Sequence, residues 1–388
     1  MLDKLTKFQR YFLYLFITIS VLFSIYTVAR IVFTFQLQDF SVYYKGTQDY
    51  LSYKNPYTNP SGEKVIYPPI SLVLLIPIGL LPFELAEKVW TLVSFTSIIL
   101  SIYILLKSTN KKVPLVAFLV VFSLFILSFP VKFTLGMGQI NLILLLLISL
   151  SFYLFQKKKQ ILSGTTLAIA ASIKLSPIIL LLFYIRKKQW KTVASCIVVF
   201  TLLNLLGVGL LGVDATKDYW IDIFPNIPTI GNSSYYNQAF TGWLSRAFVS
   251  NPISRIINYL AFGFLLFFSI KITKITRRAP ELELGEYSLF IIATLIGGGL
   301  AWQHHFVTTL IPFIALGFML FKYRGKNSRI VVAMTLLAYF LIASNIKNPI
   351  TVSGFGNVLL LSHVLYGTIL LYVLLVLSLK FRALKAKD

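Results

Sequence analysis

The side chains that could do chemistry in this chain are few and far apart. They are Asp39, Asp49, Gln139, Asn141, Lys174, Asn237, Gln238, Arg246, His304 and His305. A carboxylate or a histidine can take a proton from a hydroxyl group, whereas a lysine, an arginine or a protonated histidine can neutralise an anion. These residue types favour acid–base chemistry beside an anionic group.

Motifs for several other chemistries are absent from the sequence. It contains no P-loop, no dinucleotide-binding glycine fingerprint, no Asp-x-Asp pair and no His-Glu-x-x-His. The single cysteine, Cys196, rules out a disulfide framework and a cysteine metal cluster. Adjacent helical side chains point about 100° apart, so His304 and His305 are poorly arranged to chelate one metal. We therefore expect no metal and no cofactor.

Asp39 is the candidate general base. It opens the segment Asp39–Ser52, whose aromatic residues suit a helix that lies along the membrane surface. Partial desolvation there would raise the pKa of its carboxyl group toward a range useful for a base. The alternative is an N-cap, because aspartate is favoured just before a helix. Asp49, later in the segment, is expected to face solvent.

Lys174 is the candidate anion-binding cation. Residues 161–186 lie between two basic clusters, so the chain must enter and leave the membrane there as a short helical hairpin with its tip at Lys174–Pro177. Pro177 suits the first turn of a new helix. A lysine recessed at such a tip needs an anion nearby.

The remaining candidates also have simpler explanations. His304 and His305 lie between two apolar runs, where such residues commonly anchor helices at the interface. Alternatively, one of them faces a cavity and hydrogen-bonds a phosphate or the acid. Gln139 and Asn141, in the sequence GMGQINL, could end a turn, and Arg246 could extend from an interfacial helix to water.

The elements that must position these residues are membrane-spanning helices. Of the 388 residues, 57% are hydrophobic and only 13% are charged, which excludes a soluble globular protein. A helix needs ~20 apolar residues to cross a bilayer. The apolar runs predict an all-α polytopic membrane protein of about 12 spans, at residues 11–35, 84–107, 113–130, 140–156, 161–173, 175–186, 191–212, 256–271, 287–301, 305–321, 330–345 and 358–380.

The net charge of +23 follows the predicted topology rather than a nucleic-acid site. Lysine and arginine gather in alternate loops, which the positive-inside rule places in the cytoplasm together with both termini. We predict one plasma-membrane domain, residues 1–388, whose outer face carries two long loops, 36–83 and 213–255. Within the first loop, residues 67–83 are too short an apolar run to span and predict a re-entrant or interfacial helix.

In its motifs and their order the sequence resembles glycosyltransferase family 87, which contains membrane mannosyltransferases of the GT-C superfold. One departure is Ala239, where a serine is expected. The residues that carry the resemblance are Asp39, Val42-Tyr43, Gly46, Asn55-Pro56-Tyr57, Tyr67-Pro68-Pro69, Gly138-Gln139-Ile140-Asn141, Lys174, Pro177, Asn237-Gln238, Arg246 and Trp302 with His304-His305.

The resemblance implies a helical bundle of the GT-C type and an inverting transferase. Such an enzyme passes a sugar, usually mannose, from a polyprenyl-phosphate donor to a lipid- or glycan-linked acceptor at the outer face of the membrane. Asp39 would be the base, assisted by His305 or His304, and Lys174 and Arg246 would contact the donor phosphate. The residues expected to bind substrates are Tyr43, Tyr67, Gln139, Asn141, Asn237, Gln238 and Trp302.

A lipid-linked donor also fits the predicted topology, because sugar nucleotides are confined to the cytoplasm. The expected partners are this donor, the acceptor and membrane lipids, and the product would belong to the cell envelope. A transporter or flippase is the alternative, although such proteins usually carry ionisable residues at mid-membrane, where only Lys174 comes close. A non-catalytic scaffold is a third class.

Overall fold

The computed structural model describes residues 6–34, 36–58, 65–110, 112–230, 233–248, 252–322, 328–346 and 355–385. Within these ranges the chain is helical and forms no β-strand, although Asn237 and Trp302 pair as an isolated antiparallel bridge. The all-α prediction is therefore confirmed. Parts of both predicted outer loops, residues 59–64, 231–232 and 249–251, lie outside the described residues.

Six helical segments in the described ranges are long and apolar enough to cross a membrane, or up to seven if a bent pair is counted as one span. They fit a multi-pass membrane protein, but the predicted number of about 12 spans is not confirmed. The six lie in α1 (Lys7–Thr34), α5 (Phe83–Thr109), α11 (Trp190–Leu211), α14 (Pro252–Ile272), η5 (Gln303–Thr309) with α16 (Leu310–Lys322), and α19 (His363–Lys385).

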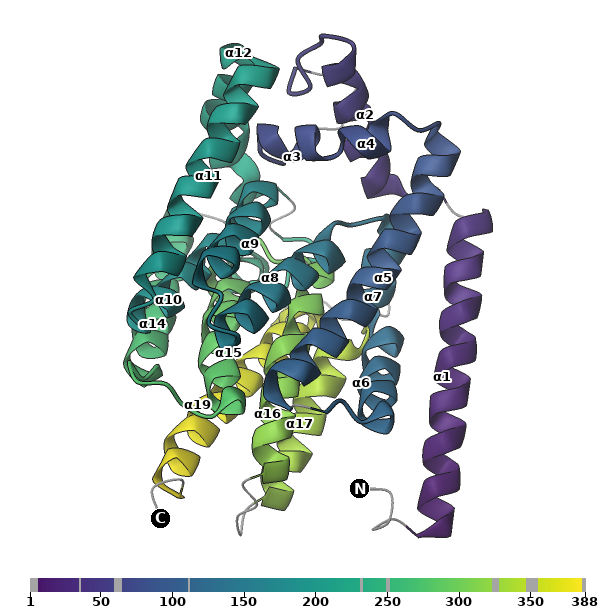
Figure 1. Cartoon of the computed structure of the whole chain (residues 1–388), viewed down its shortest axis with the longest axis vertical. Helices are drawn as coiled ribbons and strands as arrows, with labels where there is room; N and C mark the ends of the chain where they lie inside the picture. Colours follow the sequence, from purple (N-terminus) through teal and green to yellow (C-terminus); the bar gives the residue numbers. More distant parts are fainter. Residues whose placement is uncertain are drawn as a thin grey trace.

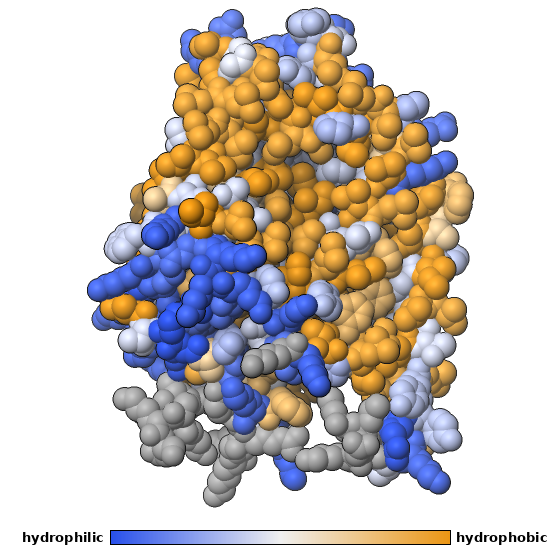
Figure 2. All heavy atoms as spheres, in the orientation of Figure 1, coloured by the Kyte–Doolittle hydropathy of each residue, from blue (hydrophilic) through white to orange (hydrophobic). Residues whose placement is uncertain are grey.

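The surface of these helices suits lipid. Leu202 and Leu205 on α11, and Leu260 and Phe264 on α14, are exposed side chains. Figure 2 shows hydrophobic residues over most of the face in view, with the largest group of hydrophilic residues in a lower area and others along the top and the right edge. A soluble monomer rarely exposes apolar patches of this extent. The exposed faces are therefore the ones that contact the bilayer.

The two ends of the bundle differ. α1 begins and α19 ends at the lower end of Figure 1, whereas α2 (Gln38–Leu51), α3 (Pro69–Leu74) and α4 (Ile76–Gly79) lie at the upper end. This arrangement agrees with two termini on one side of the membrane. Which side faces the cytoplasm stays a prediction.

The chain bends sharply after α6 (Leu115–Leu127). Ser128 is extended, and α7 (Phe129–Met137) starts at an angle of 66° to α6 with Pro130 in its first turn. A proline fits this position because the first-turn N–H groups need no helical partner. The span predicted over residues 113–130 thus bends near its end, and α7 leads the chain to Gly138 and Gln139.

The predicted hairpin is confirmed. α9 (Gln160–Ile173) ends at an extended Lys174, and η2 (Ser176–Leu180) continues into α10 (Leu181–Arg186). α9 packs closely on α11 because Gly164 has no side chain, and a Cβ atom there would collide with the backbone of Thr192. This contact fixes the arm that carries Lys174.

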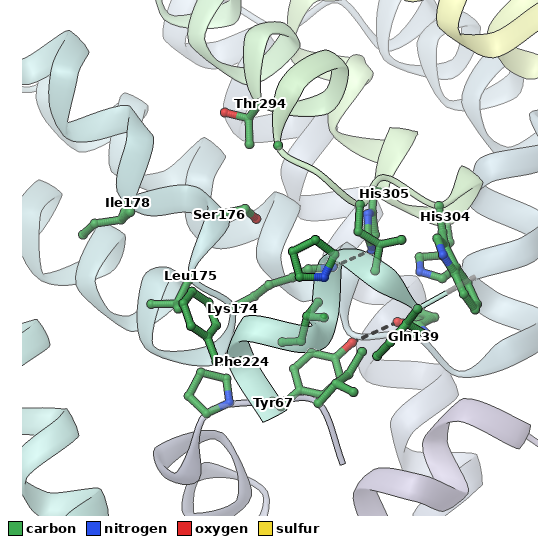
Figure 3. Close-up of a pocket in the computed structure, with 18 of the residues that line it drawn as sticks. Tyr67, Gln139, Lys174, Leu175, Ser176, Ile178, Phe224, Thr294, His304 and His305 are labelled. Atoms are coloured by element: carbon green, nitrogen blue, oxygen red, sulfur yellow. Dashed lines mark hydrogen bonds between the residues drawn. The ribbon is translucent and has the colours of Figure 1, made fainter. Parts of the chain in front are cut away.

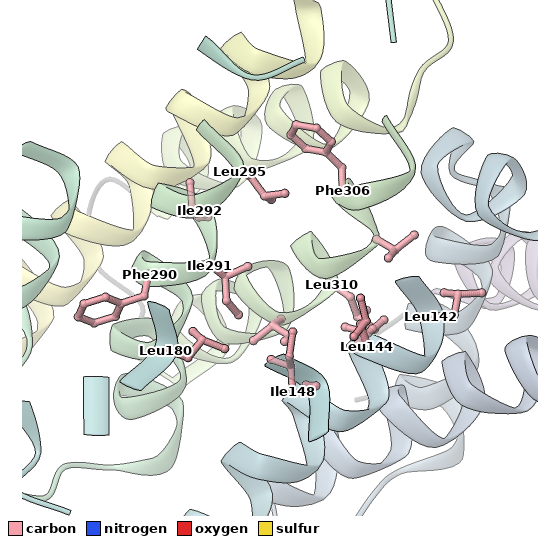
Figure 4. Close-up of a cluster of buried hydrophobic side chains, with 14 of the residues drawn as sticks. Leu142, Leu144, Ile148, Leu180, Phe290, Ile291, Ile292, Leu295, Phe306 and Leu310 are labelled. Atoms are coloured by element: carbon pink, nitrogen blue, oxygen red, sulfur yellow. The ribbon is translucent and has the colours of Figure 1, made fainter. Parts of the chain in front are cut away.

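The core behind the hairpin tip is apolar. Figure 4 shows Ile148 of α8 (Asn141–Gln156), Leu180, Phe290 of α15 (Pro280–Gly297) and Leu310, all buried. Inside a bilayer such contacts stabilise through close packing rather than through removal from water. They hold η5 against α8 and α15. The other described elements are α12 (Val213–Lys217), η3 (Asp218–Ile223), η4 (Phe224–Thr229), α13 (Phe240–Ala247), α17 (Ser328–Ala343) and α18 (Phe355–Leu361).

A buried ion cluster joins the hairpin to α15. The ammonium nitrogen of Lys187 lies 3.2 Å from Glu283 Oε1 and 2.6 Å from Glu286 Oε2, and none of these three side chains is exposed. Arg277 and Arg278 pair with the same two acids at 3.2 and 2.9 Å. Removing one member of a buried cluster leaves the other charges without compensation.

We predict that Lys187→Met destabilises the fold by about 3–5 kcal/mol, because Glu283 and Glu286 would keep their buried charge and lose a cation. Thermal unfolding of the purified protein in detergent measures the change. Lys188→Met is the matched control, since Lys188 is exposed and should leave the Tm unchanged. Equal losses in both variants would contradict the assigned role of the cluster.

Candidate active site

A cavity of about 640 Å³ lies beside α2, the hairpin tip, η4 and η5. Its volume is in the range of small-ligand sites, roughly 300–1,000 Å³. Figure 3 shows side chains from distant parts of the chain converging on it. Its polar lining consists of Asp39, Tyr43, Tyr67, Gln139, Lys174, Ser176, Tyr219, Tyr259, Thr294, Trp302, His304 and His305.

Asp39 lies in the first turn of α2. Leu37 is the N-cap residue and no side chain caps the helix, so the alternative that Asp39 is an N-cap is wrong. Its Oδ2 atom instead accepts a hydrogen bond from Nε2 of Gln139. Burial raises the pKa of the Asp39 carboxyl group, and the hydrogen bond from Gln139 lowers it in part. Asp39 therefore faces the cavity as a partly desolvated carboxylate, whereas Asp49 does not line it.

The turn that carries Gln139 packs against the start of α2. Gly138 ends α7 with a φ of 72°, a conformation that favours glycine. A Cβ atom at Gly138 would lie 2.6 Å from Phe40 Cβ and 2.8 Å from Leu37 Cβ. Trp90 of α5 donates its indole N–H to the Gly138 carbonyl at 2.7 Å. Close approach and this hydrogen bond together place Gln139 beside Asp39.

Two tyrosines bind the other end of the Gln139 side chain. The hydroxyl groups of Tyr43 and Tyr67 lie 2.8 and 3.2 Å from Gln139 Oε1 and 2.9 Å from each other. Burial raises the pKa of both phenols, so both stay neutral and can donate. Figure 3 shows Tyr67 and Gln139 pointing toward each other.

Lys174 contacts a histidine rather than a carboxylate. Its Nζ atom lies 2.6 Å from Nε2 of His305 and 3.4 Å from Oδ1 of Asn141, and Figure 3 marks the contact with His305. No ion pair joins Lys174 to an acid in the described part of the chain. The anion that the sequence predicts beside this recessed cation is therefore not a side chain of the described residues.

His304 and Trp302 present unpaired polar atoms at the cavity. The ring of His304 packs 5.4 Å from Phe133 and 5.7 Å from Trp302, and 4.6 Å from the ring of His305. Within the described ranges, His304 Nδ1 and Trp302 Nε1 are buried without a hydrogen-bond partner. Because buried polar groups are normally paired, both atoms are suited to contact a ligand. No group of three or more His, Cys, Asp or Glu side chains in those ranges could hold a metal ion.

Arg246 does not line the cavity. Its guanidinium group donates to the carbonyls of Ser234 and Asn237 at 2.9 and 2.8 Å, and to the Ser362 hydroxyl at 2.8 Å. Burial lowers the pKa of Arg246 to about 10. In this structure Arg246 braces α13 against the segment before it, and its predicted contact with a donor phosphate stays a prediction.

The other predicted polar residues surround the site without all reaching the cavity. Oδ1 of Asn237 accepts from the backbone of Ala239 and Ala301, and Nε2 of Gln238 donates to the Tyr235 and Leu361 carbonyls. These bonds and the bridge to Trp302 hold the segment that leads into η5. Asn141 lines a smaller cavity of about 90 Å³ that also contacts Lys174 and His305.

One wall of the larger cavity is apolar and was not among the residues singled out in the sequence. It includes Phe224 and Ile227 of η4, Ile178 of η2 and Phe262 of α14. The available signal was FPNIP, residues 224–228, in which two prolines force an irregular turn. Irregular backbone at membrane depth is tolerated where protein covers it or where it lines a cavity.

Known proteins similar to this chain are glycosyltransferases by name. The chain is 28% identical over 263 residues to a polyprenol-phosphate-mannose-dependent alpha-(1-2)-phosphatidylinositol pentamannoside mannosyltransferase of Mycolicibacterium smegmatis. The matched segment covers 64% of this chain and 59% of the relative. It is 26% identical over 290 residues to a polyprenol-phosphate-mannose-dependent alpha-(1-2)-phosphatidylinositol mannoside mannosyltransferase of Mycobacterium tuberculosis, with 70% and 65% covered.

A third relative has a different activity in its name. An alpha-(1->3)-arabinofuranosyltransferase of Mycobacterium tuberculosis is 26% identical over 269 residues, covering 64% of this chain and 58% of the relative. In all three comparisons the matched part is less than two thirds of the relative's own length.

The family comparison covers most of the chain. The model of glycosyltransferase family 87 matches residues 66–344. This segment starts after α2 and Asp39, and it includes Tyr67, Gln139, Lys174 and the two histidines of η5. Membership does not favour the transporter or flippase that the span count also allowed. The chain belongs to glycosyltransferase family 87.

Proposed function

We propose that this protein transfers a sugar from a polyprenyl-phosphate donor to a hydroxyl group of a lipid- or glycan-linked acceptor. The observation that carries the proposal is one cavity lined by both a partly desolvated carboxylate, Asp39, and the part-buried amino group of Lys174. A proton acceptor and a cation in one site are the two groups that transfer from a phosphate donor needs.

The reaction balances with these groups alone. Asp39 takes the proton of the acceptor hydroxyl group as its oxygen forms a bond to the anomeric carbon of the sugar. The bond between that carbon and the phosphate oxygen breaks, and its electron pair leaves with the polyprenyl phosphate. Attack from the face opposite the phosphate inverts the configuration at the anomeric carbon.

Lys174 is proposed to bind the donor phosphate. The leaving group gains negative charge during transfer, and a positioned cation in a site of low dielectric stabilises this charge. His305 holds the ammonium group at 2.6 Å, which restricts its position before the donor arrives. The unpaired Nδ1 of His304 and Nε1 of Trp302 provide further polar contacts for the sugar or the phosphate.

The apolar wall is proposed to hold the start of the polyprenyl chain. Phe224 and Ile227 of η4 face the same cavity as Phe262 of α14, and α14 carries exposed apolar side chains such as Leu260 and Phe264. A hydrocarbon chain that follows this wall passes from the phosphate site to the lipid-facing surface without crossing a charged residue of the cavity lining.

Mannose is the proposed sugar, because two of the relatives are named as mannosyltransferases that depend on polyprenol-phosphate-mannose. Their names also suggest a phosphatidylinositol mannoside as the first acceptor to test. The outer leaflet of the plasma membrane is the proposed location of the reaction, on the basis of the positive-inside distribution. α2, α3 and α4 lie at the end of the bundle opposite the start of α1, as this topology requires.

The first prediction concerns the base. Asp39→Asn should lower transfer by about 10²–10⁴-fold and leave donor binding largely intact, since the amide keeps the shape but cannot accept the proton. The assay follows radiolabelled mannose from polyprenyl-phosphate mannose to a phosphatidylinositol mannoside. Asp49→Asn is the matched control on the same helix and should transfer normally. Full activity of Asp39→Asn would exclude this residue as the base.

The second prediction concerns pH. Burial raises the pKa of Asp39, and only the deprotonated form accepts a proton, so transfer should fall as the pH decreases through a value above the ordinary ~3.9 of aspartate. The transfer rate at saturating donor, measured over the acid range, gives this midpoint. A rate that stays constant down to the ordinary aspartate pKa would be incompatible with a desolvated base.

The third prediction concerns the cation. Lys174→Met should weaken binding of polyprenyl-phosphate mannose by about tenfold or more, because a charge-assisted contact contributes about 1.5–3 kcal/mol. Equilibrium binding of the radiolabelled donor in detergent measures the effect. Lys191→Met, at an exposed lysine of α11, should bind like the wild type. Unchanged donor affinity in Lys174→Met would remove the phosphate site from this position.

A further inference from the structure

The amide group of Gln139 has a partner at each end. Oε1 lies within hydrogen-bond distance of two phenol hydroxyl groups, and Nε2 donates to Asp39 Oδ2. A primary amide has one acceptor atom and one donor atom, so two neighbouring O–H donors determine which end of the side chain turns toward Asp39. The orientation of the amide follows from its partners.

We infer that Gln139, held by Tyr43 and Tyr67, is a positioning residue for the Asp39 carboxylate. It holds Oδ2 and leaves Oδ1 to take the proton of the acceptor. No hydrogen bond to Oδ1 is present in the described part of the chain. The inference rests on the proposed function for its consequence in catalysis, but its claim about the ionisation of Asp39 stands separately.

The network is more than core packing because every polar group in it would be costly to bury alone. Tyr43, Tyr67 and Gln139 are all buried, and they come from α2, from the segment before α3 and from the turn after α7. The chain of hydrogen bonds ends at a carboxylate in the cavity wall. A side chain needed only to fill space would be apolar here.

Loss of the phenols would let the amide turn over. In the turned amide Oε1 would face Oδ2 of Asp39, an arrangement that suits only the protonated carboxyl group, because its O–H can donate to Oε1. The amide would then stabilise both forms of Asp39 instead of the charged form alone, and the carboxyl group would stay protonated to higher pH. The backbone cannot relieve this conflict, because Gly138 lies directly against Leu37 and Phe40 and is bonded to Trp90.

Other groups near Asp39 also influence its ionisation. Tyr43 is on its own helix and Tyr67 precedes α3, while Lys174, His304 and His305 line the same cavity. On α5, Glu87 accepts the backbone N–H of Leu37 at 2.6 Å, at the start of α2. None of these groups changes in a Gln139 variant, so such a variant isolates the contribution of the amide.

The test is a pH titration of the full chain in lipid nanodiscs, in which infrared difference spectroscopy measures the protonation of Asp39 at each pH. The carboxyl band of Asp39 is identified by its loss in Asp39→Asn. In Gln139→Met we expect the pKa of Asp39 to rise by about one unit, because a hydrogen bond to the charged form is lost. Tyr43→Phe and Tyr67→Phe together should also raise this pKa, by less than Gln139→Met because the amide can still donate to the carboxylate, but by more than the sum of the single variants.

Tyr44→Phe is the matched control. Tyr44 is the neighbour of Tyr43 on α2, and its hydroxyl group donates to the Leu81 carbonyl at 2.7 Å, outside the cavity. This variant loses one part-buried phenol hydrogen bond but should leave the titration of Asp39 unchanged. A shift of equal size in Tyr44→Phe would mean that α2 is only loosened, and would overturn the inference.

The outcomes separate this inference from the proposed function. An Asp39 pKa that is unchanged in both Gln139→Met and the double tyrosine variant overturns the positioning role, even if transfer is observed. The expected pKa shift in a protein without transfer activity supports the positioning role and counts against the proposed function. If Gln139→Met does not fold, the double tyrosine variant decides. Where transfer is measured, the acid limb of kcat should move with the pKa, while the KM for the donor stays nearly constant.

Discussion

A polar group inside an apolar bundle must find its partner within the protein, because lipid offers none. This constraint organises the region around the cavity. Gln139 is hydrogen-bonded to Asp39 and to two tyrosines, and Lys174 contacts His305. Arg246 donates hydrogen bonds to backbone carbonyls. Among the groups that remain without a partner in the described residues, His304 Nδ1 and Trp302 Nε1 belong to residues that line the cavity. A substrate bound there could supply the missing partners.

The two halves of the cavity are held by different means. Asp39 depends on contacts at the end of the bundle that carries α2, α3 and α4, where the Gly138 turn packs against α2 and is hydrogen-bonded to Trp90. Lys174 depends on a hairpin that is packed on α11 through Gly164 and tied to α15 by the ion cluster around Lys187. Asp39 and Lys174 are thus placed by separate parts of the fold. A change in one part need not displace the other.

Local signals carried the sequence-based predictions that succeeded. Apolar runs predicted helices, and Lys174 followed by Pro177 predicted the hairpin tip, because each depends on residues close together in the chain. The N-cap alternative for Asp39 failed to anticipate a partner 100 positions away. The span predicted over residues 113–130 did not anticipate the bend at Ser128, which depends on tertiary packing. The bonds of Arg246 to Ser234 and Ser362 likewise depend on tertiary contacts that no spacing rule reveals.

The hydrogen bond from the Leu37 backbone to Glu87 has a mechanical consequence. α1 exposes apolar side chains such as Phe8, Leu15 and Leu22 to lipid, so its tilt will follow the thickness of the surrounding bilayer. Leu37 is hydrogen-bonded to α5 just before α2 begins. The start of α2 is therefore anchored to a second membrane helix, and the depth of Asp39 does not depend on the tilt of α1 alone.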